Sequence, residues 1–133
     1  MTDRRAPLDP DGLATRRAVL GDAYVDAALG QADDFAWPMQ ELVTRNCWND
    51  IWNRPGLPRP TRSLINIAML VALNRPHELK VHLRGALNNG CTEEEIREVL
   101  MQCAAYCGFP AAIDGLRTAR EVLAERQRGT GAV

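Results

Sequence analysis

The segment between residues 59 and 95 constrains the fold of this chain more than any other. Residues 61–73 are apolar on nearly every side of a helix, so that helix has to lie in the centre of a core or in an interface between subunits. Asn74 is then suited to cap a second helix, which has Pro76 in its first turn and ends at Gly90. The pattern therefore predicts a buried helix followed directly by a second, partly apolar one.

Helical patterns also account for the N-terminal half of the chain. Apolar residues recur every three or four positions between residues 11 and 29, where Gly21 is a weak point. A further helix is expected to start at Trp37 and Pro38, since proline is well suited to a first turn. Residues 53–60 contain three prolines and one glycine, and they must form a loop.

Two more helices are expected in the last third of the chain. Thr92 and Glu95 predict a capping box at the start of the first, and Gly108 and Pro110 separate it from the second. The residues of the last helix that are expected to face the core are Ile113, Leu116, Ala119 and Leu123. No alternating strand pattern competes with these signals, so the predicted fold class is all-α.

Length and charge limit the kinds of protein that this chain can be. Its 133 residues fit one compact domain, which we expect to span residues 11–126, between a flexible N-terminus (1–10) and a disordered tail (127–133). A net charge of −1 argues against a nucleic-acid partner. The chain contains neither an apolar run of membrane-spanning length nor a signal-peptide core, so we expect a cytoplasmic protein with no membrane partner.

Cysteine spacing and the choice of basic residue bear on the chemistry. The four cysteines form no CxxC pair and no zinc spacing, so they are expected to be buried free thiols, with no metal. Every basic side chain except Lys80 is arginine, which favours binding of an anionic small molecule because arginine recognises carboxylates bidentately. A GC-rich genome explains the same bias equally well.

His82 is the most distinctive candidate for catalysis. It is one of only two histidines, it lies inside a strong helical pattern, and an imidazole gives or takes a proton near neutral pH. Arg75 and Glu78 share its helix face, although a salt-bridged surface stripe explains the same spacing. Glu41 is a second candidate acid, and its alternative is an exposed ion pair with Arg45, one turn away.

Long segments of the chain resemble the carboxymuconolactone decarboxylase family. The resemblance is carried by RRAVLGDAYVD (16–26), by QELVTRNCW and IWNRPGL (within 40–57), by RPTRSLINIAMLVALNRPHELKVHLRGALNNGCTEEEIREVLMQCAAYCGFPAA (59–112) and by REVLAE (120–125). It covers residues 13–125 and includes loops and polar positions as well as an apolar rhythm.

This resemblance implies a fold, an assembly and a reaction. The fold is an AhpD-like helical bundle of a single domain, and the assembly is a homo-oligomer, with a ring-like hexamer as one arrangement. The reaction is decarboxylation of a small dicarboxylate lactone, 4-carboxymuconolactone, to 4-oxoadipate enol-lactone in the protocatechuate branch of the β-ketoadipate pathway. No cofactor is expected, because the conjugated lactone carbonyl of the substrate accepts the electrons that departing CO₂ leaves.

The reaction assigns expected roles to the candidate residues. We expect His82 to donate the proton or to stabilise the enolate, with Glu78 orienting its ring. The candidates for binding the substrate carboxylates are Arg75, Arg45, Arg62 and either Arg16 or Arg17. Trp48 and Trp52 are candidate pocket walls, although large aromatic residues at this spacing are more often plain core.

Three alternatives to this activity remain open. AhpD-like alkylhydroperoxidases share the fold but carry CxxC followed by histidine. Alignment on His82 puts Arg75 and Glu78 at the two thiol positions and Ser63 near the relay glutamate, so the peroxidase machinery is missing. The other two alternatives are an enzyme of this fold that acts on another lactone or enolisable acid, and a non-catalytic helical assembly.

Overall fold

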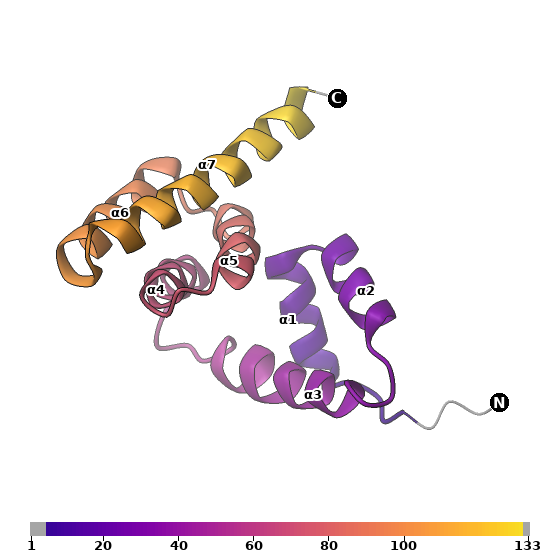
Figure 1. Ribbon diagram of the computed structural model, residues 1–133. Coiled ribbons are helices and arrows are strands. Elements are labelled where there is room, and N and C mark those ends of the chain that lie inside the picture. Colours follow the sequence, from indigo (N-terminus) through magenta and orange to yellow (C-terminus); the bar gives the residue numbers. More distant parts are fainter. Residues whose placement is uncertain (1–4, 132–133) are drawn as a thin grey trace. The chain divides into compact units, whose positions relative to one another are not determined.

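The computed structural model describes residues 5–131, and every regular element in this range is a helix (Figure 1). The predicted all-α fold class is therefore confirmed. Where the sequence predicts one domain of residues 11–126, the contacts within the chain divide it into two compact units, Met1–Pro58 and Arg59–Val133. The boundary lies in the predicted proline-rich loop. None of the described helices is both long and apolar enough to cross a membrane.

The N-terminal unit comprises α1 (Pro10–Leu20), α2 (Asp22–Gln31), α3 (Trp37–Leu42) and the π-helix η1 (Val43–Ile51), which continues directly from α3. The Asp9 carboxylate caps α1 by accepting a hydrogen bond from the backbone N–H of Gly12 (2.8 Å). Gly21 has a φ of 88°, so the weak point predicted within residues 11–29 is a break between α1 and α2. The sequence does not predict that the helix beginning at Trp37 widens into a π-helix.

Helix α1 packs against η1 in the N-terminal unit. The core there consists of Val19, Trp48 and Trp52, and the two indole rings are stacked with centroids 5.0 Å apart. Gly12 permits the close approach of the helices, because a Cβ at this position would overlap the backbone carbonyl oxygen of Thr44. The packing of the two helices thus depends on a residue without a side chain.

Residues at the start of the described chain are held against α3. Arg5 forms an ion pair with Asp34 (3.1 Å) and its guanidinium lies over the Trp37 ring, 4.9 Å from the centroid. The indole N–H of Trp37 donates a hydrogen bond to the backbone carbonyl of Ala6 (3.0 Å). Residues 5 and 6 of the segment that the sequence predicts to be flexible thus make defined contacts, while residues 1–4 lie outside the described range.

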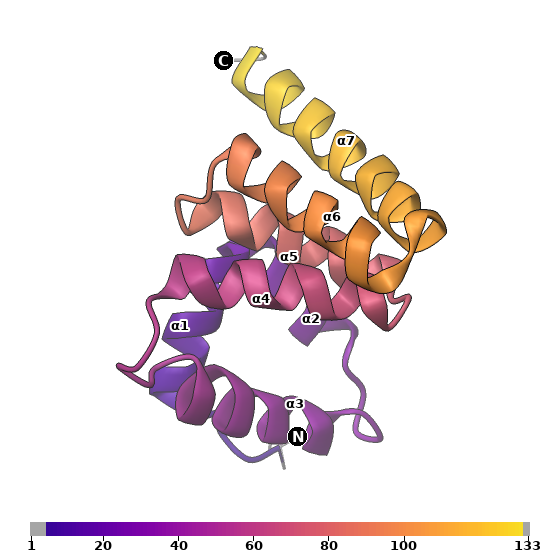
Figure 2. The ribbon, with the colours of Figure 1, turned by 90° about the vertical axis from the view of Figure 1, so that its left-hand side faces the viewer.

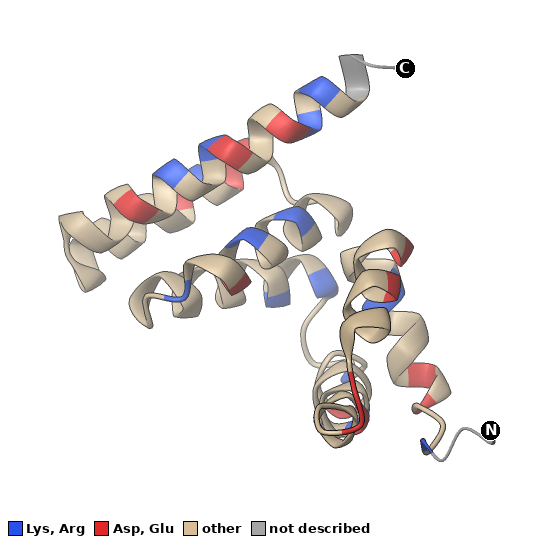
Figure 3. Cartoon of the chain, turned by 45° about the vertical axis from the view of Figure 1, so that its right-hand side comes forward, with Lys and Arg blue, Asp and Glu red and all other residues tan. Residues whose placement is uncertain are grey.

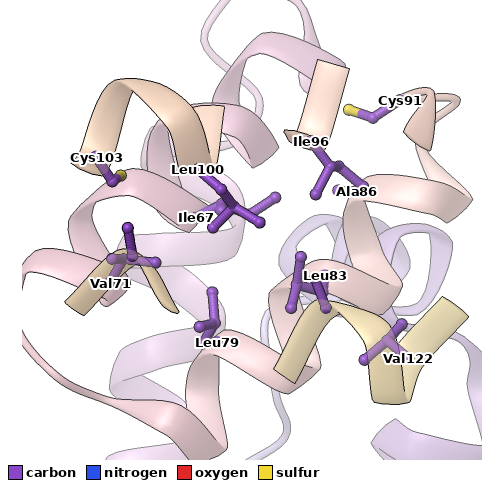
Figure 4. Close-up of a cluster of buried hydrophobic side chains, with 12 residues drawn as sticks. Ile67, Val71, Leu79, Leu83, Ala86, Cys91, Ile96, Leu100, Cys103 and Val122 are labelled. Atoms are coloured by element: carbon purple, nitrogen blue, oxygen red, sulfur yellow. The ribbon is translucent and has the colours of Figure 1, made fainter. Parts of the chain in front are cut away.

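The C-terminal unit comprises α4 (Arg59–Ala72), α5 (Pro76–Asn88), α6 (Glu93–Cys107) and α7 (Phe109–Gly131). Helix α4 contacts the other three, as its apolar sequence predicts, and α6 and α7 lie side by side (Figures 1 and 2). Their buried side chains point toward one another in a common core (Figure 4), whose main members are Ile67, Val71, Leu79, Leu83, Leu100 and Val122. Helix α4 is still not buried on every side, since Ile65 and Met69 are exposed.

The ends of these helices agree with the sequence signals except at Asn74. Thr92 and Glu95 form the predicted capping box, with N···O distances of 3.0 and 2.9 Å. Asn74 does not cap α5, because it adopts a left-handed conformation (φ 55°) in the turn and Arg75 occupies the N-cap position. Asparagine suits both roles, which explains the error.

Helix α7 differs from the prediction in both its buried face and its length. Ile113 and Leu116 are exposed, while Ala112, Gly115, Ala119 and Val122 are buried. The reason is close packing at Gly115, where a Cβ would lie 2.9 Å from Val71 Cγ2 and 3.0 Å from Leu100 Cδ2. Helix α7 also continues to Gly131, so the predicted disordered tail is helical up to that residue, while residues 132–133 lie outside the described range.

Charged residues and cysteines occur in both units. Acidic and basic residues are interspersed along α7 (Figure 3). All four cysteines are free. Cys91 and Cys103 are buried as predicted, whereas Cys47 is half-buried and Cys107 is exposed.

Candidate active site

Helix α5 positions Arg75, Glu78 and His82. Pro76 fixes the first turn, and the buried Leu79 and Leu83 turn one face of the helix into the core of the C-terminal unit. Arg75 at the N-cap and Glu78 in the first turn are exposed, and His82, one turn further on, is half-buried. The core therefore determines the direction in which the imidazole projects.

The environment of His82 favours the neutral imidazole. Burial lowers the pKa of His82 below its ordinary value, and the nearby Glu78 carboxylate opposes this shift without cancelling it. A neutral ring has one N–H donor and one nitrogen that accepts a proton. His82 is thus suited to donate a hydrogen bond to a developing oxyanion, or to act as a strong acid once it is protonated.

Arg75 lines a cavity that the other two α5 candidates do not line. It lines a cavity of about 270 Å³ between the α4–α5 turn and α7, together with Leu79, Gly115 and Arg117. Neither Glu78 nor His82 is among the residues that line this cavity. Of the three α5 candidates, this cavity therefore involves Arg75 alone.

Two further residues of interest lie on α4. Arg62 is half-buried. Ser63, which aligns near the relay glutamate of the peroxidases, is fully buried, and its hydroxyl accepts a hydrogen bond from the side-chain amide of Asn89 (2.9 Å). This bond ties α4 to the end of α5 and leaves Ser63 with a structural role.

The N-terminal unit contains the other predicted site residues. Glu41 is half-buried and Arg45 is exposed, and within the described part of the chain no ion pair joins them. Trp48 and Trp52 are 4% and 3% exposed and stack within the core around Val19. Their burial matches the alternative interpretation, in which the two aromatic residues are core.

The structure distinguishes the adjacent arginines that the sequence left as alternatives. Arg17 lies at the surface and forms ion pairs with Asp26 (2.8 Å) and Asp22 (3.2 Å). Arg16 is only 7% exposed, and its NH1 group donates a hydrogen bond to the Gln40 amide oxygen (2.8 Å). Arg16 lies one turn from Gly12 and from Val19, and this helical spacing is the sequence signal that could have identified it.

A metal centre has no obvious ligands in the described part of the chain. No three His, Cys, Asp or Glu side chains of residues 5–131 are arranged to hold a metal ion. The C-terminal unit offers an imidazole of lowered pKa with a neighbouring carboxylate, and each unit by itself offers arginines. Arginine can bind carboxylates, and an imidazole can stabilise or protonate an enolate.

Comparison with known proteins shows which family has a similar sequence. Residues 38–121 match the Carboxymuconolactone decarboxylase family. The chain is 44% identical over 111 residues to 4-carboxymuconolactone decarboxylase of Acinetobacter baylyi, which covers 84% of this chain and 83% of that protein. It is also 44% identical over 106 residues to nitrosuccinic acid decarboxylase of Metarhizium robertsii, which covers 80% and 74% of the two chains. With more than half of its length matched and this level of identity, the chain belongs to the carboxymuconolactone decarboxylase family.

Proposed function

We propose that this protein decarboxylates 4-carboxymuconolactone to 4-oxoadipate enol-lactone without a cofactor, as a carboxy-lyase of the protocatechuate branch of the β-ketoadipate pathway. The observation that carries the proposal is the 44% identity to the Acinetobacter baylyi decarboxylase over 84% of the chain. The identity extends well beyond any single helix, so it includes both units.

The chemistry of the substrate defines what the site must supply. The departing carboxylate is attached to the ring carbon next to the ring oxygen, and this carbon is conjugated through C=C to the lactone carbonyl. The electron pair released with CO₂ flows to that carbonyl and forms a dienolate. The protein therefore has to hold two carboxylates, stabilise the enolate oxygen and deliver a proton to carbon.

His82 and Glu78 are the residues that we assign to the last two tasks. Because burial lowers the pKa of His82, its neutral N–H is available at neutral pH to donate a hydrogen bond to the enolate oxygen. In its protonated form the same ring would be a stronger acid than an ordinary histidine and would transfer a proton to carbon readily. Glu78 opposes the loss of the protonated form and orients the ring. Glu41, half-buried in the N-terminal unit, remains the second candidate acid.

A second candidate substrate is nitrosuccinic acid, on which the Metarhizium robertsii relative acts according to its name. Loss of CO₂ from the carbon that bears a nitro group leaves electrons that the nitro oxygens accept as a nitronate. The two reactions thus make the same demands, since each forms an anion on oxygen and each substrate keeps a second carboxylate. Parallel assays of both substrates would show which one this chain prefers.

The assembly that we propose is a cytoplasmic homo-oligomer. Exposed apolar side chains on α4 and α7 support self-association, because a soluble monomer rarely leaves so many large ones in water. They are Ile65, Met69, Phe109, Ile113 and Leu116. Sedimentation of the purified full chain would give the number of subunits.

An ultraviolet assay on enzymatically generated 4-carboxymuconolactone tests the reaction and the role of His82. We expect turnover in the native protein, and a loss of about 100-fold or more in His82→Gln, as removal of a general acid produces. His77→Gln is the matched control, since His77 is exposed on the same helix and is expected to leave turnover unchanged. Absence of turnover in the native protein would contradict the substrate, and full activity of His82→Gln would contradict the site.

A further inference from the structure

The N-terminal unit contains a buried guanidinium without a carboxylate partner. Arg16 is 7% exposed, and no carboxylate of the described residues forms an ion pair with it. Its NH1 group donates to the neutral amide oxygen of Gln40 (2.8 Å), and its Nε atom is buried without any hydrogen-bond partner. A guanidinium has five N–H donors, so most of its hydrogen-bonding capacity toward a planar oxyanion is unused.

The titratable groups that act on Arg16 do not neutralise its charge. They are Tyr24 on α2 and Cys47 on η1, and neither of them is a carboxylate. Burial raises the pKa of the Cys47 thiol, although a hydrogen bond with Trp52 and the charge of Arg16 act in the opposite direction. Cys47 therefore remains an uncharged thiol at neutral pH, and the charge of Arg16 is left uncompensated.

A second polar side chain in the same helix contact also lacks a partner. Thr44 is fully buried, and its hydroxyl oxygen has no hydrogen-bond partner. Gly12 on α1 lies against the Thr44 carbonyl, and Arg16, one turn further on, reaches Gln40, which is one turn before Thr44. The two unsatisfied groups thus belong to one contact between α1 and the continuous helix α3–η1.

The neighbouring arginine shows how this unit pairs a charge when the partner is part of the protein. Arg17 binds the carboxylates of Asp26 and Asp22 at the surface, where a charge is also well solvated. Arg16 has given up most of its solvation and has gained only one amide in return. Buried charges in proteins are normally paired, so a missing protein partner indicates a ligand.

We propose that Arg16, assisted by Gln40, is the binding site for a carboxylate group of a small anionic ligand. The unused N–H groups of the guanidinium would bind both carboxylate oxygens, as in bidentate arginine–carboxylate pairs. That this carboxylate belongs to the lactone substrate rests on the proposed function, whereas the need for an anion rests on Arg16 alone. Arg16 and not Arg17 is then the arginine of this pair that contributes to substrate binding.

Binding of succinate to the full chain tests the proposal without any turnover. The arginine Nε–H signals are followed by ¹⁵N NMR, and Arg16→Met identifies the signal of Arg16 by its disappearance. We expect succinate to shift this signal, and its calorimetric affinity to fall by at least about tenfold in Arg16→Met. Arg17→Met, which removes the same charge one residue away, should bind succinate as the native protein does. Equal affinity in the native protein and in Arg16→Met would overturn the proposal.

Gln40→Glu provides a second test that does not require removal of the arginine. It places a carboxylate on the side chain that already lies 2.8 Å from NH1 of Arg16. The internal carboxylate should raise the melting temperature without ligand and abolish the further rise that succinate produces. A succinate response equal to that of the native protein would show that the anion does not bind at Arg16. A response to sulfate as large as that to succinate would overturn the assignment to carboxylates.

Turnover of 4-carboxymuconolactone separates this proposal from the proposed function. If succinate binds through Arg16 and the native protein does not turn the lactone over, the proposed function fails and the carboxylate site stands. If the native protein turns the lactone over and Arg16→Met has an unchanged KM, the carboxylate site fails and the function stands.

Discussion

Arg16 in the N-terminal unit and the basic residues of α5 in the C-terminal unit have opposite surroundings. In the C-terminal unit, Lys80 and Arg84 on α5 reach the same carboxylate, Glu125 on α7, at 3.2 and 2.9 Å, near the surface. In the N-terminal unit, Arg16 is buried against the neutral amide of Gln40. In the first arrangement the carboxylate of Glu125 pairs the basic groups and joins two helices. In the second, no carboxylate of the described residues pairs the guanidinium. A buried charged group without a charged partner is more informative about function than an ion pair at the surface.

The cores of the two units also differ, in size and in tryptophan content. Eleven buried residues from four helices, together with Cys91 from the connection between α5 and α6, form the core of the C-terminal unit (Figure 4), whereas that of the N-terminal unit has three, two of them stacked tryptophans. All three tryptophans of the chain lie in the N-terminal unit. Tryptophan fluorescence therefore reports on that unit alone, while far-ultraviolet circular dichroism reports on the helices of both. Denaturation followed by both probes can resolve the units.

The largest expected effect is on the larger core. Leu83 is 1% exposed at its centre, and Leu83→Ala should reduce the free energy of unfolding by about 2–5 kcal/mol because it leaves a cavity. Urea denaturation followed by circular dichroism measures the change. Leu73→Ala, at an exposed position after α4, should change stability by less than about 0.5 kcal/mol. If the fluorescence transition of Leu83→Ala shifts as far as the dichroism transition, the two units unfold together and the contrast between them does not extend to stability.

A pair of glycine substitutions compares the helix contacts of the two units. Gly12→Ala forces a Cβ against the Thr44 carbonyl, which is backbone and cannot turn aside, so it should destabilise by about 3 kcal/mol. Gly115→Ala meets methyl groups of Val71 and Leu100, which can shift, and should cost about 1 kcal/mol after the gain in helix propensity. Gly30→Ala, in open space on α2, should stabilise slightly. The ranking fails if Gly115→Ala proves the more damaging of the first two.

These glycines also show how far the sequence predicts the fold. The capping box at Thr92 and the central position of α4 follow from signals within one segment, and both are confirmed. The buried face of α7 does not follow, since only its contact with α4 and α6 excludes larger side chains at Gly115 and turns Ile113 outward. Local patterns determine where helices begin and end, while tertiary contacts select the face that is buried.

The same distinction applies to the candidate site. The position of His82 on a helix with Glu78 one turn before it was predictable from spacing. The choice between Arg16 and Arg17 follows only once Gly12 and Val19 are recognised as the buried face of α1, because adjacent residues on a helix project about 100° apart. The cavity that Arg75 lines likewise depends on the position of α7, which is distant in the sequence and contributes Gly115 and Arg117.

His82 should give a pH dependence of stability with a definite sign. Its pKa is lowered in the folded protein by burial, so the folded state binds fewer protons than the unfolded state below about pH 6.5. Its contribution is therefore complete above that pH and decreases as the pH falls toward the folded-state pKa. Melting temperatures between pH 7.5 and 5 should decrease less in His82→Gln than in the native protein. Parallel curves for the two proteins would mean that burial of His82 does not favour the neutral ring.

The smallest expected effect concerns the paired charges of the C-terminal unit. Arg84 and then Lys80 hold the pKa of Glu125 below its ordinary value, so the stabilising contribution is present above about pH 4.3 and is lost as the pH falls through the lower folded-state pKa. Because the side chains are about one-third exposed, Glu125→Gln should cost less than about 1 kcal/mol at neutral pH. The loss should diminish in high salt, which screens surface pairs.

Arg16→Met is the counterpart in the N-terminal unit. Without ligand it should leave the protein as stable as before or more stable, because it removes a buried charge that has no carboxylate partner. A loss of stability in Arg16→Met larger than in Glu125→Gln would mean that Arg16 is a structural residue. The two units would then differ only in the size and composition of their cores.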